Sequence, residues 1–195
     1  MAPDRTSAKI KLEDIIKQVE GQRFPPVEKW NPEFCGDIDM RIARDGTWFY
    51  MGTPIGRERM VKLFSTVLRK DDDGKTYLVT PVEKIGITVE DAHFIATSME
   101  VIEEGGQQLL KFTTNVGDEV IAGEKHPIRV EVDDESKEPR PYILVRGRLE
   151  ALISRNVFYE LVDRAETRKE GGRTYLAIKS GDTTFSLGQL DDGDV

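Results

Sequence analysis

The feature that most constrains the fold of this chain is a segment that occurs twice, with a period of 98 residues. Residues 55–78 align without a gap with residues 153–176. Average residue usage would give about one or two identities by chance in such a window. The positions that recur identically are, in the first copy, Ile55, Arg57, Leu63, Gly74, Thr76, Tyr77 and Leu78. Because solenoid repeats are shorter, about 20–50 residues, the repeat predicts two similar modules that pack together.

Local patterns predict an α+β fold with one helix in each module. Apolar residues at helical spacing indicate a short helix over about residues 11–20, and a proline-rich segment beginning at Arg23 indicates a stiff linker. In each copy of the repeat we expect a strand, an Ile-x-Arg motif, a helix, a glycine turn and a second strand. The first helix is expected to open at Thr53-Pro54, because proline is tolerated in a first turn, and the second to cover about 155–166.

Alternating apolar and polar residues between the two copies predict hairpins and short strands. With 38% hydrophobic and 33% charged residues, the composition is that of an ordinary globular protein. We therefore divide the chain into an N-terminal helix and linker (1–24), a first α+β module (25–84) and a second β-rich module (85–195).

The charge balance argues against two classes of partner. The chain carries 28 basic and 36 acidic residues, a net charge of −8. Binding to a nucleic acid polymer or to an anionic membrane requires a basic surface, so neither is expected. No apolar run is long enough to span a membrane, and the first residues lack the apolar core of a secretory signal. We therefore expect a cytoplasmic location.

No pattern in the sequence predicts catalysis, a cofactor or a metal. Cys35 is the single cysteine, and with His93 and His126 as the two histidines a Cys/His metal site is not expected. Both histidines precede an apolar residue at the start of an expected strand, which favours structural hydrogen bonding over catalysis, and there is no nucleophile elbow. The protein is therefore not expected to be an enzyme.

The motif Gly74-Lys75-Thr76 looks like the end of a phosphate-binding P-loop. Arg69 occupies the position of the required first glycine, and the order is helix to strand where a P-loop runs from strand to helix. A glycine turn that ends a helix is the better interpretation.

Arg57 and Arg155 each stand at the start of an expected helix. A cation gains nothing from the positive end of a helix dipole, so each arginine needs another partner. That partner is either a carboxylate of the facing module or an anionic ligand that also uses the free helix N–H groups. Trp48 and Tyr50 belong to an aromatic cluster in the first module, which serves either core packing or stacking on a planar ligand.

Several longer segments resemble those of an uncharacterised bacterial family, domain of unknown function 1285. They include residues 36–39, 45–50, 52–57, 77–84, 112–115, 126–128, 140–146 and 149–155, so that the resemblance covers about residues 25–190. The resemblance implies two duplicated domains, of which the second is superficially like a pleckstrin-homology fold. It also implies a ligand cleft at the domain interface that suits a nucleotide-like molecule, and a role in signalling.

Our leading hypothesis is therefore a module that binds a small anionic, nucleotide-like ligand between its two domains. The expected ligand-binding residues are three arginines, two aromatic residues and two hydrogen-bonding residues: Arg57, Arg146, Arg155, Trp48, Tyr50, Asn115 and His126. One alternative is a protein-interaction module that binds a peptide or a partner domain. A second is a hydrolase that uses His126 with a carboxylate.

Overall fold

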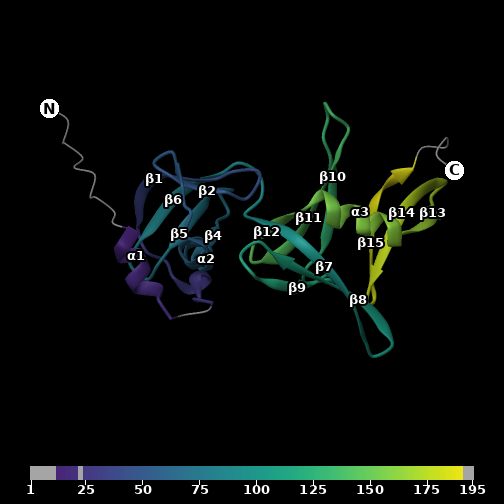
Figure 1. The fold of residues 1–195 in the computed structure, drawn as a ribbon, viewed down its shortest axis with the longest axis horizontal. Coiled ribbons are helices and arrows are strands. Elements are labelled where there is room, and N and C mark those ends of the chain that lie inside the picture. Colours follow the sequence, from purple (N-terminus) through teal and green to yellow (C-terminus); the bar gives the residue numbers. More distant parts are fainter. Residues whose placement is uncertain (1–11, 22–23, 191–195) are drawn as a thin grey trace.

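The computed structural model describes residues 12–21 and 24–190. The predicted helix start at Lys11 and the linker residue Arg23 lie outside these ranges. The described chain forms two domains that lie side by side along the longest axis of the molecule (Figure 1). The first domain, purple to blue, holds α1, α2 and β1–β6, and the second, teal to yellow, holds β7–β15 and α3.

The first domain is built on a six-stranded sheet with the order β3-β2-β1-β6-β5-β4. Two antiparallel meanders, β1–β3 and β4–β6, are joined through the parallel pair β1 and β6. The strands are β1 (Phe34–Ile42), β2 (Trp48–Tyr50), β3 (Thr53–Pro54), β4 (Leu68–Lys70), β5 (Thr76–Val79) and β6 (Lys84–Val89). The helical elements of this domain are α1 (Leu12–Val19), the 3₁₀ turn η1 (Val27–Lys29) and α2 (Glu58–Thr66).

The second domain repeats this sheet topology. Its order, β10-β11-β12-β7-β8-β9, again joins two antiparallel meanders through a parallel pair, here β7 and β12. The strands are β7 (Phe94–Glu104), β8 (Gln107–Thr114), β9 (Glu119–Ile121), β10 (Ile128–Val132), β11 (Pro139–Arg146) and β12 (Leu149–Ile153). Helix α3 (Arg155–Arg164) then leads into a three-stranded sheet of β13 (Glu166–Glu170), β14 (Arg173–Ser180) and β15 (Thr183–Leu190). The predicted α+β class with two similar β-rich modules is confirmed.

The sequence repeat corresponds to a helix followed by a hairpin. The first copy contains α2, β4 and β5, and the second contains α3, β13 and β14. The hairpin registers differ, because Lys70 pairs with Thr76 whereas its counterpart Arg168 pairs with Tyr175, one residue beyond the counterpart of Thr76. Directly paired residues share one face of a sheet, so this shift of one residue exchanges the faces of β14 relative to β5.

Three sequence-based expectations about the elements need correction. The first repeat helix begins at Glu58 and not at Thr53-Pro54, because the Ile55 N–H donates to the Trp48 carbonyl (2.8 Å) and keeps these residues in the sheet. Strands β4 and β13, which directly follow the helices, were not expected. Strand β6 pairs with β1 and β5, so the first sheet extends beyond Lys84, where the sequence placed the module boundary.

The core runs through both domains. In the first domain, the Trp48 and Phe64 rings stack at a centroid distance of 6.4 Å and join the sheet to α2. Ile15 and Val19 on α1 are fully buried, so this short helix is held by its apolar face. In the second domain, α3 packs against β7 and β14. Within the described residues, no helix is both long and apolar enough to cross a membrane.

Candidate functional site

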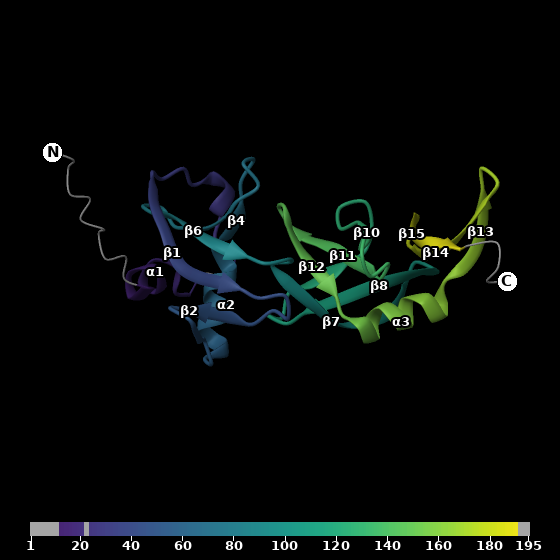
Figure 2. The ribbon, with the colours of Figure 1, turned by 90° about the horizontal axis from the view of Figure 1, so that it is seen from above.

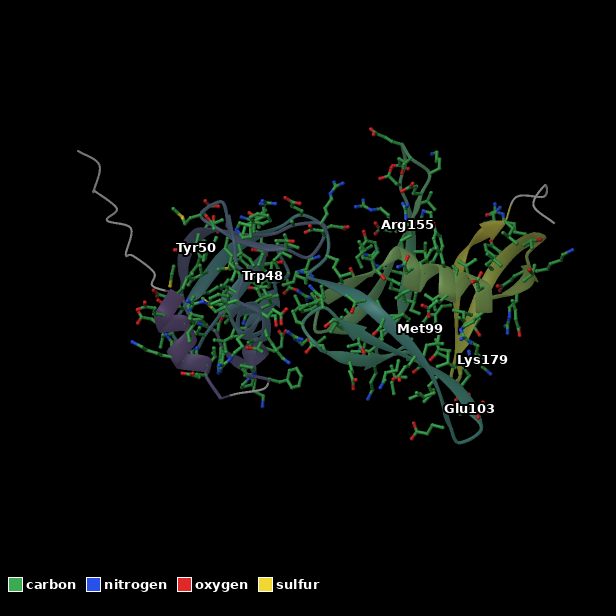
Figure 3. All side chains as sticks on the ribbon, in the orientation of Figure 1. Trp48, Tyr50, Met99, Glu103, Arg155 and Lys179 are labelled. Atoms are coloured by element: carbon green, nitrogen blue, oxygen red, sulfur yellow. The ribbon has the colours of Figure 1, made fainter. Side chains whose placement is uncertain are left out.

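The structure does not bring the seven predicted ligand-binding residues together. Trp48 and Tyr50 lie in the first domain, far along the molecule from Arg155 in the second (Figure 3). The Trp48 side chain is 1% exposed and its ring stacks on Phe64, so it presents no face to a ligand. Tyr50 is half-buried on the same strand.

The two arginines of the repeat have different surroundings. Arg57 precedes the first residue of α2, is exposed, and lines a groove formed by α1 and α2 within the first domain. Arg155 is the first residue of α3 and lines a cleft beside the domain junction. Its guanidinium lies 3.3 Å from the Glu138 carboxylate, with both side chains largely exposed. Such an exposed pair contributes little to stability, which leaves Arg155 free to bind an anion.

Arg146 joins the two domains. It forms an ion pair with Asp118, donates to the Ser65 carbonyl at the end of α2 (2.6 Å), and lies over the Phe94 ring at 5.0 Å. Its guanidinium is therefore occupied by the protein itself. Arg146, expected to supply charge to a ligand, is thus bound by Asp118 of its own domain and by the Ser65 carbonyl of the first domain.

The two hydrogen-bonding candidates also have backbone partners. Asn115 Oδ1 accepts from the Ile95 N–H (3.0 Å) beside the turn between β1 and β2. His126 Nδ1 donates to the Leu144 carbonyl at 2.9 Å. Within the described residues, no carboxylate or nucleophile hydrogen-bonds to His126.

A cleft of about 340 Å³ lies beside the domain junction and contains three arginines, and we call it the arginine cleft. Arg44 comes from the turn between β1 and β2 of the first domain, and Figure 2 shows this turn reaching the second domain next to β7. Arg140 on β11 and Arg155 on α3 come from the second domain. The Tyr159 side chain, 56% exposed, adds an accessible aromatic ring.

The arginine cleft has a surplus of positive charge. Asp91 is paired with Arg140 (3.1 Å) and accepts from the Tyr142 hydroxyl (2.7 Å). Burial raises the pKa of Tyr142 to about 12, with Asp91 acting in the same direction, so the hydroxyl keeps its proton. Within the described part of the chain, no hydrogen bond or ion pair holds the Arg44 guanidinium. Arg44 and Arg155 thus lack a buried counter-ion.

A second cleft, of about 400 Å³, lies on the other side of Asp91, and we call it the threonine cleft. Its polar lining residues are Asp37, Lys70, Lys75, Thr76, Tyr77, Thr88, Asp91 and His93. His93 is 4% exposed and its ring joins the two domains. The Glu150 backbone N–H donates to His93 Nδ1 (3.3 Å), and His93 Nε2 lies 3.0 Å from Thr76 Oγ1.

The comparisons with known proteins place the chain in a family. Residues 25–92 match the domain of unknown function DUF1285, N-terminal domain, and residues 93–187 match the protein of unknown function DUF1285, C-terminal domain. This chain belongs to the DUF1285 family. The search of curated proteins found no match.

Two solved structures of the family resemble this one. A DUF1285 family protein from Silicibacter pomeroyi DSS-3 is 48% identical, with a TM-score of 0.84 over 92% of this chain and 96% of the other. A DUF1285 family protein from Shewanella baltica OS155 is 27% identical, with a TM-score of 0.50 over 64% of this chain and 90% of the other. The family resemblance predicted from the sequence is confirmed.

Sequence reasoning missed several of the residues that this DUF1285 protein gathers at its domain junction. Arg44 was detectable in part, because the Asp45-Gly46 hairpin signal places it at the tip of an exposed turn. Lys70 and Arg140 lie on strands with no motif around them. They line the clefts because of sheet register and domain packing. His93 was identified as structural, and its contacts agree with that interpretation.

The burial of His93 predicts a pH-dependent stability. Burial lowers the pKa of His93 from 6.5 to about 4, Lys70 acts in the same direction, and Glu150 opposes it. The unfolded chain takes up a proton at this residue below about pH 6.5, whereas the folded protein does so only near pH 4. The free energy of unfolding should therefore fall by roughly 3 kcal/mol as the pH drops through this window.

Urea unfolding at several pH values between about 7 and 4.5 measures this effect. This pH range lies above the one in which most carboxylates titrate. His93→Gln removes the titrating ring, so the free energy of unfolding of this variant should be nearly independent of pH over the same window. An equal slope in the variant and the wild type would contradict the prediction.

Proposed function

We propose that this protein binds a small anionic, nucleotide-like ligand in the arginine cleft at the junction of its two domains. The observation that carries the proposal is the convergence of three guanidinium groups from both domains, Arg44, Arg140 and Arg155, on one cleft of about 340 Å³. Two of the three lack a buried counter-ion. Guanidinium groups bind phosphate oxygens with paired, charge-assisted hydrogen bonds.

The aromatic residue in the same cleft supports a nucleotide-like ligand over a bare anion. Tyr159 lies one turn along α3 from Arg155, and its ring is 56% exposed. Aromatic rings stack on the faces of nucleobases with about 1–3 kcal/mol per base. A ligand with phosphate on the arginines and a base on Tyr159 uses both features. A cytoplasmic location and a role in signalling belong to this proposal.

A nucleotide panel tests the proposed function. Isothermal titration or a thermal-shift screen with nucleoside mono-, di- and triphosphates should reveal a ligand that stabilises the wild-type protein. Arg44→Ala and Arg155→Ala should each weaken the binding of that ligand by about tenfold, equivalent to about 1.4 kcal/mol. The absence of any shift with all nucleotides at millimolar concentration would contradict the proposal.

The chain supplies a matched control for Arg155. Arg57→Ala removes the repeat counterpart of Arg155, an exposed arginine at the equivalent helix start but outside the arginine cleft. This variant should bind the ligand like the wild type. An equal loss in the Arg57 and Arg155 variants would indicate a general charge effect and not a site.

The two alternatives stay predictions. For the interaction module, the described residues expose large apolar side chains on separate elements, such as Phe34 on β1, Met51 after β2 and Val132 on β10. For the hydrolase, His126 has a backbone carbonyl as its partner. Neither observation favours these functions over ligand binding.

A further inference from the structure

The hydrogen bonds around His93 fix the direction in which the Thr76 hydroxyl points its proton. A backbone N–H can only donate, so the bond from Glu150 requires His93 Nδ1 to be unprotonated. The neutral ring then carries its proton on Nε2, which donates to Thr76 Oγ1 at 3.0 Å. Thr76 must therefore donate its own proton elsewhere.

No acceptor for that proton lies within the described residues. Thr76 is 5% exposed, its Oγ1 makes the bond to His93, and the side chain lines the threonine cleft. A buried donor without an acceptor costs about 1–3 kcal/mol, so such groups normally have a protein, water or ligand partner. The Thr76 hydroxyl is thus a hydrogen-bond donor without an acceptor at the wall of the cleft.

Two lysines line the same cleft, and the Glu150 carboxylate attracts the first of them, Lys70, without forming an ion pair with it. Lys70 is half-buried on β4, directly opposite Thr76, and Lys75 follows in the hairpin turn. Within the described ranges, neither ammonium group makes a hydrogen bond or an ion pair. The nearby Glu150 carboxylate is bound by both arms of Arg129 (2.6 and 2.7 Å). Two ammonium groups and a hydroxyl donor form the donor set that an oxyanion requires.

Asp37 lies on the opposite face of the sheet from Thr76, because it pairs with Gly86, which pairs with Tyr77 and not with Thr76. The side chain packs onto the backbone of Gly86, where a Cβ would lie 1.9 Å from Asp37 Oδ1, so the glycine makes room for the carboxylate. The Asp37 carboxylate therefore does not face an anion bound to the Thr76 and Lys70 side chains. The other acid in the cleft, Asp91, is already paired with Arg140.

We propose that the threonine cleft is a second ligand site, which binds a small oxyanion. Lys70, Lys75 and Thr76 bind the oxyanion. The Gly74-Lys75-Thr76 motif thus binds an anion through a hairpin turn between two strands and not through a P-loop. This site is independent of the arginine cleft.

Glycerol 3-phosphate and inorganic phosphate are the probes. In an NMR titration of the whole protein, glycerol 3-phosphate should cause saturable shifts of the Lys75 and Thr76 amide signals. Inorganic phosphate should shift the same signals, because the oxyanion itself makes the contacts with the site. Shifts that do not saturate, or that centre on other residues, would overturn the site.

Two substitutions of Thr76, one that removes the hydroxyl and one that keeps it, test the role of this group. Thr76→Val should weaken binding of glycerol 3-phosphate by about tenfold, whereas Thr76→Ser, which keeps the donor, should stay within about twofold of the wild type. Unchanged affinity in Thr76→Val would overturn the proposal. If Thr76→Val does not fold, Lys70→Met gives the same test, with a loss of about tenfold expected and an unchanged affinity contradicting the site.

Two controls separate this site from other effects. Lys17→Met removes the same charge from the exposed face of α1 and should bind glycerol 3-phosphate like the wild type. Arg44→Ala and Arg155→Ala should also leave this binding unchanged. Weaker binding of glycerol 3-phosphate in these two variants would contradict a site that is separate from the arginine cleft. Weaker binding in Lys17→Met would show a non-specific charge effect.

Discussion

Arg69→Ala is expected to lower the free energy of unfolding by about 3–5 kcal/mol, the range for breaking a buried ion pair. Arg69 is 7% exposed and ties β4 and the turn after it to the segment around η1. It binds both carboxylate oxygens of Asp71 (2.6 and 3.2 Å) and donates to the Val27 and Trp30 carbonyls (2.9 and 2.7 Å). Removing the guanidinium leaves the two carbonyls without these donors and Asp71 with Lys84 as its remaining cation.

Urea unfolding of the Arg69 variants measures this effect. Arg69→Lys should recover less than half of the loss, because an ammonium group cannot reproduce the planar fork that reaches Asp71 and two carbonyls at once. Arg57→Ala, which removes an exposed arginine, should change the stability by less than about 0.5 kcal/mol. A loss below about 1 kcal/mol in Arg69→Ala would contradict the account given for this residue.

Arg146→Ala is expected to lower the free energy of unfolding by about 2–4 kcal/mol. The variant loses the ion pair with Asp118, the hydrogen bond to the Ser65 carbonyl and the contact with the Phe94 ring. Asp118, with a side chain 16% exposed, is then left without its cation. Because Ser65 belongs to the first domain and Asp118 to the second, the contact between the domains should weaken as well.

A double-mutant cycle isolates the pair. Asp118→Asn alone should destabilise less than Arg146→Ala, since the amide can still accept from the arginine. The two substitutions together should cost less than the sum of the single losses by about 1 kcal/mol or more, because each removes the attraction between the charges of Arg146 and Asp118. Additive losses would show that Arg146 acts through Ser65 and Phe94 and not through Asp118.

The fold was predictable at the level of its repeated unit. The identical Ile, Arg, Gly, Thr and Tyr positions correctly predict a helix followed by a glycine turn and a strand in both halves. Strands β4 and β13 were missed because they are short segments directly after a helix, and β13 consists of the exposed polar residues Glu166–Glu170, which give no apolar alternation.

The candidate sites were less predictable, because their residues come from distant parts of the chain. Arg155 was identified through the repeat and lines the arginine cleft, but its counterpart Arg57 faces a groove of the first domain. Arg146 has the features of a ligand-binding arginine and is bound by the protein itself. No local pattern distinguishes these three surroundings.

The sequence by itself determined the α+β class, the family and the duplicated helix and hairpin, because periodicity and turn residues act over short distances. Only the tertiary structure decided what each copy does. In the first copy Lys70 pairs with Thr76, whereas in the second copy Arg168, the counterpart of Lys70, pairs with Tyr175. The two hairpins therefore differ in register by one residue. Domain packing then brings His93 against Thr76 and fixes the direction of the Thr76 hydroxyl. Register and packing depend on the whole sheet, and a repeat in the sequence cannot specify them.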